Sequence, residues 1–167
     1  MIRLAVKEDM PVIERLYADA RDRMRADGNP TQWGDVYPPV TLLYEDIKRE
    51  RLYVYIPDGE NQIVRGVFAY IMGADPTYQY IEDGAWLSDT PYGTIHRIAG
   101  DASAHGVFNK CVDWAVNMCP HLRMDTHRNN KRMQHLAESR GFIRCGTIYI
   151  PGDVVNNDTA RVAYELI

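Results

Sequence analysis

The chain has 167 residues, of which 46% are apolar and 25% are charged. This size and composition are typical of a globular protein with a substantial core, so we expect a single domain over residues 1–167. The formal net charge of −4 argues against a nucleic-acid binder that relies on a basic surface, and we expect no nucleic-acid partner.

The cysteines and the N-terminus bear on the cellular setting. Cys111, Cys119 and Cys145 form no CxxC pair and cannot all pair with one another, which favours a reduced compartment. The first residues, MIRLAVKEDM, contain no apolar signal-peptide segment. No apolar run approaches the roughly 20 residues needed to span a bilayer. We therefore expect a cytoplasmic protein that does not associate with membranes.

The first third of the chain predicts a strand followed by two helices. Apolar and polar residues alternate over 2–6, as in a short strand. Asp9 is the expected N-cap of a helix that a Gly-Asn-Pro run ends at 28–30. An irregular aromatic loop over 31–40 then leads to a second helix, for which Thr41 is the expected cap.

The middle of the chain predicts a hairpin and then a long irregular segment. Strands are expected over 52–56 and 63–72, joined by a loop at 57–61 whose Pro-Asp-Gly run is typical of a tight connection. Gly66 is a candidate bulge. The segment 73–92 holds four aromatic residues among Asp, Gly and Pro, so it either packs over the core or lines a binding surface.

The next unit is a strand, a loop of small residues and a helix. The strand is expected over 94–99, the loop over 100–106, and the helix from Val107 to the Cys-Pro pair at 119–120. Free backbone N–H groups and the positive end of the helix dipole converge in such a unit, which predicts an anion cradle for a phosphate-bearing ligand or an ordinary tight turn.

The last part of the chain predicts a strand, a helix and two more strands. The strand spans 122–126, Asn129 or Asn130 caps the helix, and Gly141 is the natural residue just beyond its end. The final strands are expected over 142–150 and 161–167, with a polar turn region over 151–158 between them.

This order of elements predicts the fold class. Helix-carrying connections imply parallel pairing at the centre of the sheet, and hairpins imply antiparallel edges. We therefore predict an α/β (α+β) fold with one mixed, mostly antiparallel, twisted sheet of six to seven strands and helices on both faces.

Two stretches carry a family resemblance that covers nearly the whole chain. IHRIAGDASAHGVFNKCVDWA looks like a fourth strand, a pyrophosphate loop and the following helix, and LRMDTHRNNKRMQHLAESRGF looks like a fifth strand, an Asn-initiated helix and a terminal Gly-Phe pair. Together they resemble the GNAT superfamily of acetyl-CoA-dependent N-acetyltransferases, with its acyl-CoA N-acyltransferase-like fold. DTHRNNKRM followed by RGFIRCG is similar to a bacterial branch of small acetyltransferases.

The chain departs from the family at two places. Aligning the loop pattern Gln/Arg-x-x-Gly-x-Gly/Ala on Gly106 puts Ser103 at the first position and Phe108 at the last. Many members also carry a proton-donating tyrosine four residues before the Gly-Phe pair, where this chain has Ala137. Another group or water would then protonate the departing coenzyme A thiolate.

The resemblance implies acetyl-CoA as the acyl donor. Backbone N–H groups of the fourth strand, which the family bulges away from the fifth, would hold the pantetheine arm, and the amides of 104–108 would hold the pyrophosphate. The residues expected to bind acetyl-CoA are Ile98, Ala99, Ser103, Ala104, His105, Gly106, Val107, Phe108, Asn130 and Met133.

The implied reaction is direct attack of a primary amine of a small molecule or peptide on the thioester in a ternary complex. The amine must lose a proton, so a base helps. His96 is the first candidate, with a packed strand residue as the alternative. Asp125 is the second, with His127 as its orienter; half a metal site is the alternative, but no further ligand has recognisable spacing, so we expect no metal.

Three other polar groups have two interpretations each. Asp101 binds a cationic amine or caps the loop. Arg97 is expected to be an ion-pair partner rather than a catalyst. Cys145 packs in its strand, or forms a nucleophilic pair with His127 or His135.

Aromatic residues are the expected contacts of a cationic acceptor, through cation–π interaction. They are Trp33, Tyr37, Tyr80 and Trp86. The alternative for 78–92 is a solvated loop with core anchors. Alternative functions are a non-catalytic acyl-CoA-binding or regulatory domain of the same fold and, less favoured, a partner-binding module that uses the aromatic loop without CoA. Because homodimers are common in the family, the resemblance also allows a homodimer.

Overall fold

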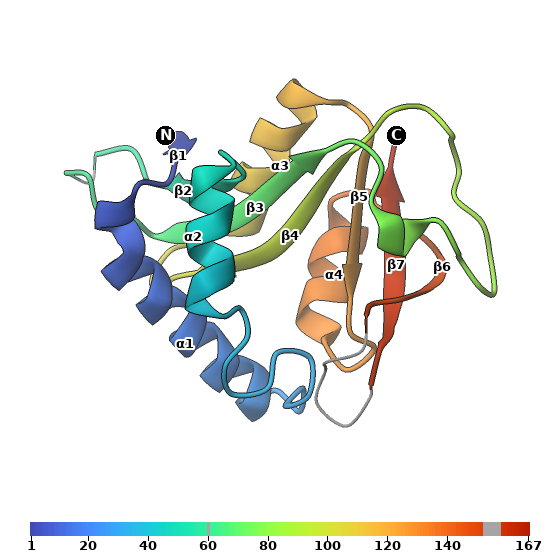
Figure 1. Cartoon of the computed structure of the whole chain (residues 1–167), viewed down its shortest axis with the longest axis horizontal. Coiled ribbons are helices and arrows are strands. Elements are labelled where there is room, and N and C mark those ends of the chain that lie inside the picture. The colour runs from blue at the N-terminus through green and yellow to red at the C-terminus, as the bar shows by residue number, and fades with distance from the viewer. Residues whose placement is uncertain (60, 152–157) are drawn as a thin grey trace.

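The computed structural model describes residues 1–59, 61–151 and 158–167 (Figure 1). Its order of strands and helices is the predicted one. The elements are β1 (Ile2–Leu4), a 3-10 turn (Lys7–Asp9), α1 (Met10–Ala26), α2 (Val40–Lys48), β2 (Leu52–Tyr55), β3 (Gly66–Met72), a second 3-10 turn (Pro76–Tyr78), β4 (Gly93–Gly100), α3 (Val107–Met118), β5 (Leu122–Thr126), α4 (Lys131–Ser139), β6 (Ile143–Tyr149) and β7 (Ala160–Leu166). Residue 60 of the predicted hairpin loop and 152–157 of the predicted polar turn lie outside the described residues.

The strands form one open, mixed sheet in the order β1-β2-β3-β4-β5-β7-β6. Neighbouring strands are antiparallel except β4 and β5, whose helix-carrying connection makes them parallel. Helices α1 and α2 cover one face, and α3 and α4 cover the other (Figure 1). The predicted fold class is confirmed. No helix in the described part of the chain is long and apolar enough to cross a membrane.

The core lies on both faces of the sheet because both are covered. Helix α1 buries Ile13, Leu16 and Tyr17, which recur at helical spacing and pack on the inner strands. A smaller cluster lies beneath the long segment 73–92, where Tyr78 and Tyr92 pack on β6 and β7. These two aromatic residues act as anchors of the segment.

Of the predicted helix caps, one is wrong and two fall at the predicted residue. Asp9 is the N-cap residue of α1, but its side chain makes no cap hydrogen bond to this helix and its carboxylate pairs with Arg3 at 2.7 Å. Helix α2 begins one residue before Thr41, after the extended residue Pro39. Asn130 does cap α4, accepting a hydrogen bond from the Met133 amide at 3.1 Å.

A bulge in β4 shapes the centre of the sheet. The register with β3 shifts between Val67 and Ala69, where residues 97–98 of β4 lie opposite one residue of β3. Arg97 has φ of 51°, a left-handed conformation that non-glycine residues adopt where their surroundings hold them. Here the Tyr17 hydroxyl donates to the Arg97 carbonyl at 2.8 Å.

The bulge separates β4 from β5. The two strands pair only at Gly93 with Leu122 and at Thr94 with Arg123, and they diverge beyond that end (Figure 1). The family resemblance implied this splay of the fourth strand from the fifth.

The bulge predicted at Gly66 is wrong, because Gly66 pairs in register with Tyr55 and Gly100. A Cβ atom at Gly66 would lie 2.6 Å from Cγ1 of Val107. Glycine is therefore needed there for the close approach of α3 to the sheet.

Candidate functional site

Two cavities adjoin where β4 diverges from β5. The helix-end cavity, of about 530 Å³, lies between α1 and the N-terminal ends of α3 and α4. The aromatic cavity, of about 680 Å³, is lined by side chains of the α1–α2 loop, β4, β5 and the segment after β3, Trp33 and Tyr37 among them. Four residues line both cavities: Met24, Ile98, Asn130 and Met133.

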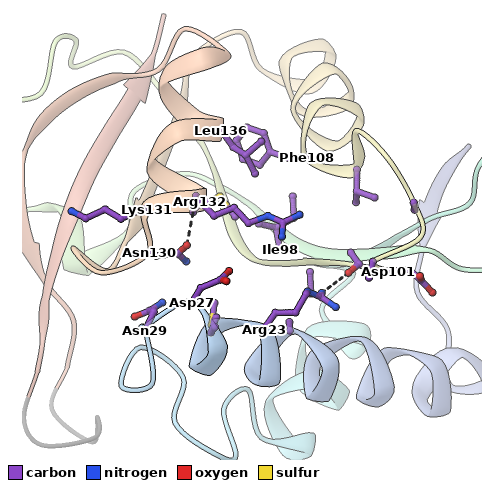
Figure 2. Close-up of a pocket in the computed structure, with 18 of the residues that line it drawn as sticks. Arg23, Asp27, Asn29, Ile98, Asp101, Phe108, Asn130, Lys131, Arg132 and Leu136 are labelled. Atoms are coloured by element: carbon purple, nitrogen blue, oxygen red, sulfur yellow. Dashed lines mark hydrogen bonds between the residues drawn. The ribbon is translucent and has the colours of Figure 1, made fainter.

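The helix-end cavity has the groups that bind anions. Gly106 is the N-cap of α3 with φ of 71° and no side-chain cap bond, so the first amides of the helix have no partner within the helix. Figure 2 shows Arg132 extending across the cavity toward Ile98, whereas Lys131 points away from it. Arg23 of α1 donates to the Gly100 carbonyl at 2.6 Å (Figure 2).

Eight of the ten predicted acetyl-CoA residues line the helix-end cavity: Ile98, Ala99, Ala104, Gly106, Val107, Phe108, Asn130 and Met133. Phe108 is buried and packs against Phe142 in the core. Ser103 and His105 are exposed and are not among the lining residues. The prediction therefore identified the wall of a real cavity, with two residues on its outer side.

Asp101 caps the loop, which was the second of its two predicted roles. The amide and hydroxyl of Ser103 both donate to its carboxylate, at 2.9 and 2.7 Å. These bonds, helped by Arg65, lower the pKa of Asp101 to about 2. The amide and hydroxyl of Ser103 are thus bound to Asp101, and Ser103 is not among the residues that line the cavity.

In the aromatic cavity, the imidazole of His96 faces a carboxylate that sequence reasoning missed. Nε2 of His96 lies 3.0 Å from Oδ2 of Asp75, just after β3. Burial alone would raise the pKa of Asp75, but hydrogen bonds from His96 and Thr77 outweigh it and lower the pKa to about 2. His96, Asp75 and Thr77 all line this cavity.

The Asp75 pair predicts a pH-dependent stability. The carboxyl ionises more readily in the folded chain, so it stabilises the fold above its unfolded pKa of about 3.9, and this contribution disappears as the pH falls toward 2. We expect Asp75→Asn to lower the free energy of unfolding by roughly 2 kcal/mol near about pH 6. Urea denaturation should show this difference shrinking below about pH 4. The control is Asp89→Asn, at an exposed position of the same segment; a difference that stays constant with pH would contradict the assignment.

Asp125, the second candidate base, is bound to a buried phenol rather than to His127. Its Oδ2 accepts from the Tyr78 hydroxyl at 2.7 Å. Burial and the neighbouring Asp125 carboxylate raise the pKa of Tyr78 well above its usual value, so the phenol stays a donor. His127 instead lies 2.6 Å from Asp158, which corrects the predicted pairing. The described residues hold no group of three side chains placed to share a metal ion.

The four predicted acceptor contacts divide into two pairs. Trp33 and Tyr37 line the aromatic cavity and lie against each other, with ring centroids 6.3 Å apart. Tyr80 is 64% exposed and stacks on Tyr149, outside the lining of both cavities. Trp86 is also outside it, because its ring lies on the Arg123 guanidinium and anchors the segment 73–92.

The alternative interpretation of Cys145, a nucleophilic pair with His127 or His135, does not form among the described residues. The thiol of Cys145 is directed to the Ile143 carbonyl and to Glu165. Burial and the Glu165 carboxylate raise the pKa of Cys145 to about 11, which keeps it protonated.

Arg161 is a second cavity residue that sequence reasoning missed. It lines the aromatic cavity and is almost fully buried. A signal for it was present, because Arg161 and Glu165 are charged residues within an otherwise apolar strand, ARVAYEL. Asp75 has no such signal, since an aspartate before a proline at the end of a strand is ordinary turn chemistry.

No protein-family model matches the chain, and no curated protein matches it. A solved GNAT-family acetyltransferase from Streptococcus agalactiae is 30% identical, with 100% of this chain and 94% of that chain covered and a TM-score of 0.87. A putative acetyltransferase from Staphylococcus aureus is 25% identical, with 99% and 97% covered and a TM-score of 0.66. Spermidine N-acetyltransferase from Vibrio cholerae, crystallised with CoA and spermine, shares the fold at 14% identity, with 99% and 94% covered and a TM-score of 0.64. The chain therefore belongs to the GNAT family of acetyltransferases.

Proposed function

We propose that this chain is a single-domain N-acetyltransferase over residues 1–167. It transfers the acetyl group of acetyl-CoA to a primary amine of a small molecule or peptide by direct attack in a ternary complex. The observation that carries the proposal is the meeting of two cavities at the β4 bulge, one with anion-binding groups and one with titratable and aromatic side chains.

The donor is assigned to the helix-end cavity. The unpartnered amides at the start of α3 and the charge of Arg132 suit the pyrophosphate. Ile98 and Asn130 line both cavities, so a pantetheine arm along β4 leads from the first cavity into the second. The Vibrio cholerae enzyme of this fold was crystallised with CoA and spermine, which supports the assignment of a CoA donor.

The reaction is assigned to the aromatic cavity. His96, oriented by Asp75, removes a proton from the acceptor ammonium, or accepts it as nitrogen attacks the thioester carbonyl. The C–N bond forms, the C–S bond breaks, and backbone N–H groups near the bulge stabilise the oxyanion. Ala137 has no proton to give and is fully buried, so we assign protonation of the thiolate to water, which suffices because a thiol is an acidic leaving group.

Two measurements test the proposal. Calorimetry with acetyl-CoA is expected to show binding, and a thiol-release assay with a panel of primary amines is expected to show turnover. Neither heat nor thiol release would overturn the assignment and leave the partner-binding module. Heat without turnover on any amine would favour the alternative, a non-catalytic acyl-CoA-binding or regulatory domain, for which Ala137 is the supporting observation.

The cellular setting is a further part of the proposal. The three cysteines are free, and the similar solved structures come from bacteria. We infer a cytoplasmic bacterial enzyme, and a homodimer is compatible with the family.

Arg132 extends across the helix-end cavity, so its substitution is expected to weaken binding of the donor. Arg132→Gln is expected to weaken acetyl-CoA binding about tenfold, because one charge-assisted hydrogen bond to a phosphate is lost. Titration calorimetry measures the Kd, and the loss should diminish at high salt. Lys110→Gln is the matched control, since Lys110 is exposed on α3 and is not among the lining residues. Equal effects of the two substitutions would refute a specific role of Arg132.

A further inference from the structure

The aromatic cavity contains a buried cation with only neutral hydrogen-bond partners. Arg161 is 3% exposed and lines this cavity. Its guanidinium donates to the carbonyls of Asp158 and Ala160 at 2.7 and 2.9 Å, and to the Gln32 carbonyl at 3.5 Å. Within the described ranges it forms no ion pair with a carboxylate. The carboxylates of Asp125 and Asp158 attract it only through space. Since neither of them is hydrogen-bonded to this buried guanidinium, an anion that bonded to it directly would be stabilised.

A second guanidinium in the same cavity has a spare donor. Arg97 pairs with Asp46 at 2.5 Å through one terminal nitrogen. Its buried Nε has no hydrogen-bond partner in the part of the chain that the structure describes. The phenol of Tyr37 interacts with both Arg97 and Arg161. We call these three lining residues the cationic corner of the aromatic cavity.

The cavity also has an acidic side. Asp75 is paired with His96, and Asp125 with the Tyr78 hydroxyl. Asp125 lies opposite Ala163 in the β5–β7 register, so its side chain shares a face with that of Arg161, two residues away along β7. A ligand that fills the cavity therefore meets both signs of charge within it.

We propose that the acceptor is an amino carboxylate with an apolar body, whose carboxylate binds the cationic corner while its amine lies beside His96. This inference rests on the proposed acetyl transfer and names its substrate class. The apolar body would contact the remaining lining side chains, which include Trp33, Ile71, Met124 and Ile150. A polyamine has no group for the cationic corner and would place further positive charge against it.

A set of matched acceptors tests the substrate class with the wild-type protein. L-phenylalanine, L-phenylalaninamide and phenethylamine share the amine and the ring, but only the first has a carboxylate. We expect kcat/KM from thiol release to be about 10- to 100-fold higher for L-phenylalanine than for either analogue. Spermine is expected to be a poor acceptor. The amine of L-phenylalaninamide is less basic than that of L-phenylalanine, so a larger fraction of it is neutral and able to attack. This difference alone would favour the amide, so it cannot produce the expected preference for L-phenylalanine.

Two variants locate the effect at the corner. Arg161→Gln is expected to reduce the preference for L-phenylalanine over phenethylamine to within about threefold, mainly through KM. Arg161→Lys keeps the charge and should retain part of the preference. Thermal unfolding checks that both variants fold, and if neither folds, the wild-type acceptor set decides.

Failure of this inference is distinguishable from failure of the proposed function. Efficient transfer to phenethylamine or spermine, with no preference for the carboxylate, overturns the inference and leaves acetyl transfer standing. If acetyl-CoA gives neither heat nor thiol release, the proposed function fails. Calorimetry of L-phenylalanine against the protein alone then decides: binding that Arg161→Gln weakens at least tenfold supports the corner, and no binding overturns it.

Discussion

Replacement of His96 by glutamine is expected to lower kcat for acetyl transfer by about 10²- to 10⁴-fold, the usual contribution of a positioned general base. The imidazole lies on β4 next to the bulge, lines the aromatic cavity and is held by Asp75 at 3.0 Å. Glutamine keeps a hydrogen-bonding side chain of similar size but cannot take up a proton. Thiol release at saturating acetyl-CoA and amine measures the effect.

The control for this substitution is His135→Gln, because His135 is exposed on α4 and is not among the lining residues of either cavity. The acetyl-CoA Kd of the His96 variant should stay close to that of the wild type, since His96 does not line the helix-end cavity. If the kcat of His96→Gln stays within threefold of the wild-type value, His96 is not the base, and Asp125 or water must act instead.

Replacement of Glu165 by glutamine is expected to lower the free energy of unfolding by about 3–5 kcal/mol, the cost of breaking a buried ion pair. Glu165 on β7 is fully buried. Its carboxylate lies 2.6 Å from Nε2 of His121 and 2.9 Å from Nε of Arg123, and it also accepts from the Leu87 amide. Burial alone would raise the pKa of Glu165, but these donors outweigh it and lower the pKa.

The ion pair of Glu165 with Arg123 also holds the segment 73–92 against the sheet. The Arg123 guanidinium lies 4.0 Å from the ring centroids of both Trp86 and Tyr92. Loss of the Glu165 charge should therefore also loosen Asp75 and Tyr78 in this segment, and hydrogen exchange should show weaker protection there.

Urea denaturation of Glu165→Gln measures the stability loss. Glu45→Gln is the matched control, because Glu45 forms an exposed helical pair with Arg49, and exposed pairs contribute little to stability. A loss below about 1 kcal/mol for Glu165→Gln would show that the buried pair contributes no more than a surface pair.

Sequence alone determined the elements, because their signals are local. Helical spacing of apolar residues, the Asn130 cap and Gly141 beyond α4 each act within one or two turns of chain. The order of these elements then predicted the sheet with its parallel centre, since connections restrict pairing. The loop and helix of the acetyl-CoA resemblance are likewise contiguous in sequence, so most of their predicted residues do line one cavity.

Tertiary structure alone decided the side-chain partners in the aromatic cavity. His96 meets Asp75 across 21 positions, Asp125 meets Tyr78 across 47, and Arg161 meets Gln32 across 129. Such contacts depend on the β4 bulge, on the path of the segment 73–92 and on which strand faces coincide, and none of these has a local signal. The charges that would choose the acceptor are therefore visible only once β4, β5 and β7 lie side by side, because packing brings distant residues together.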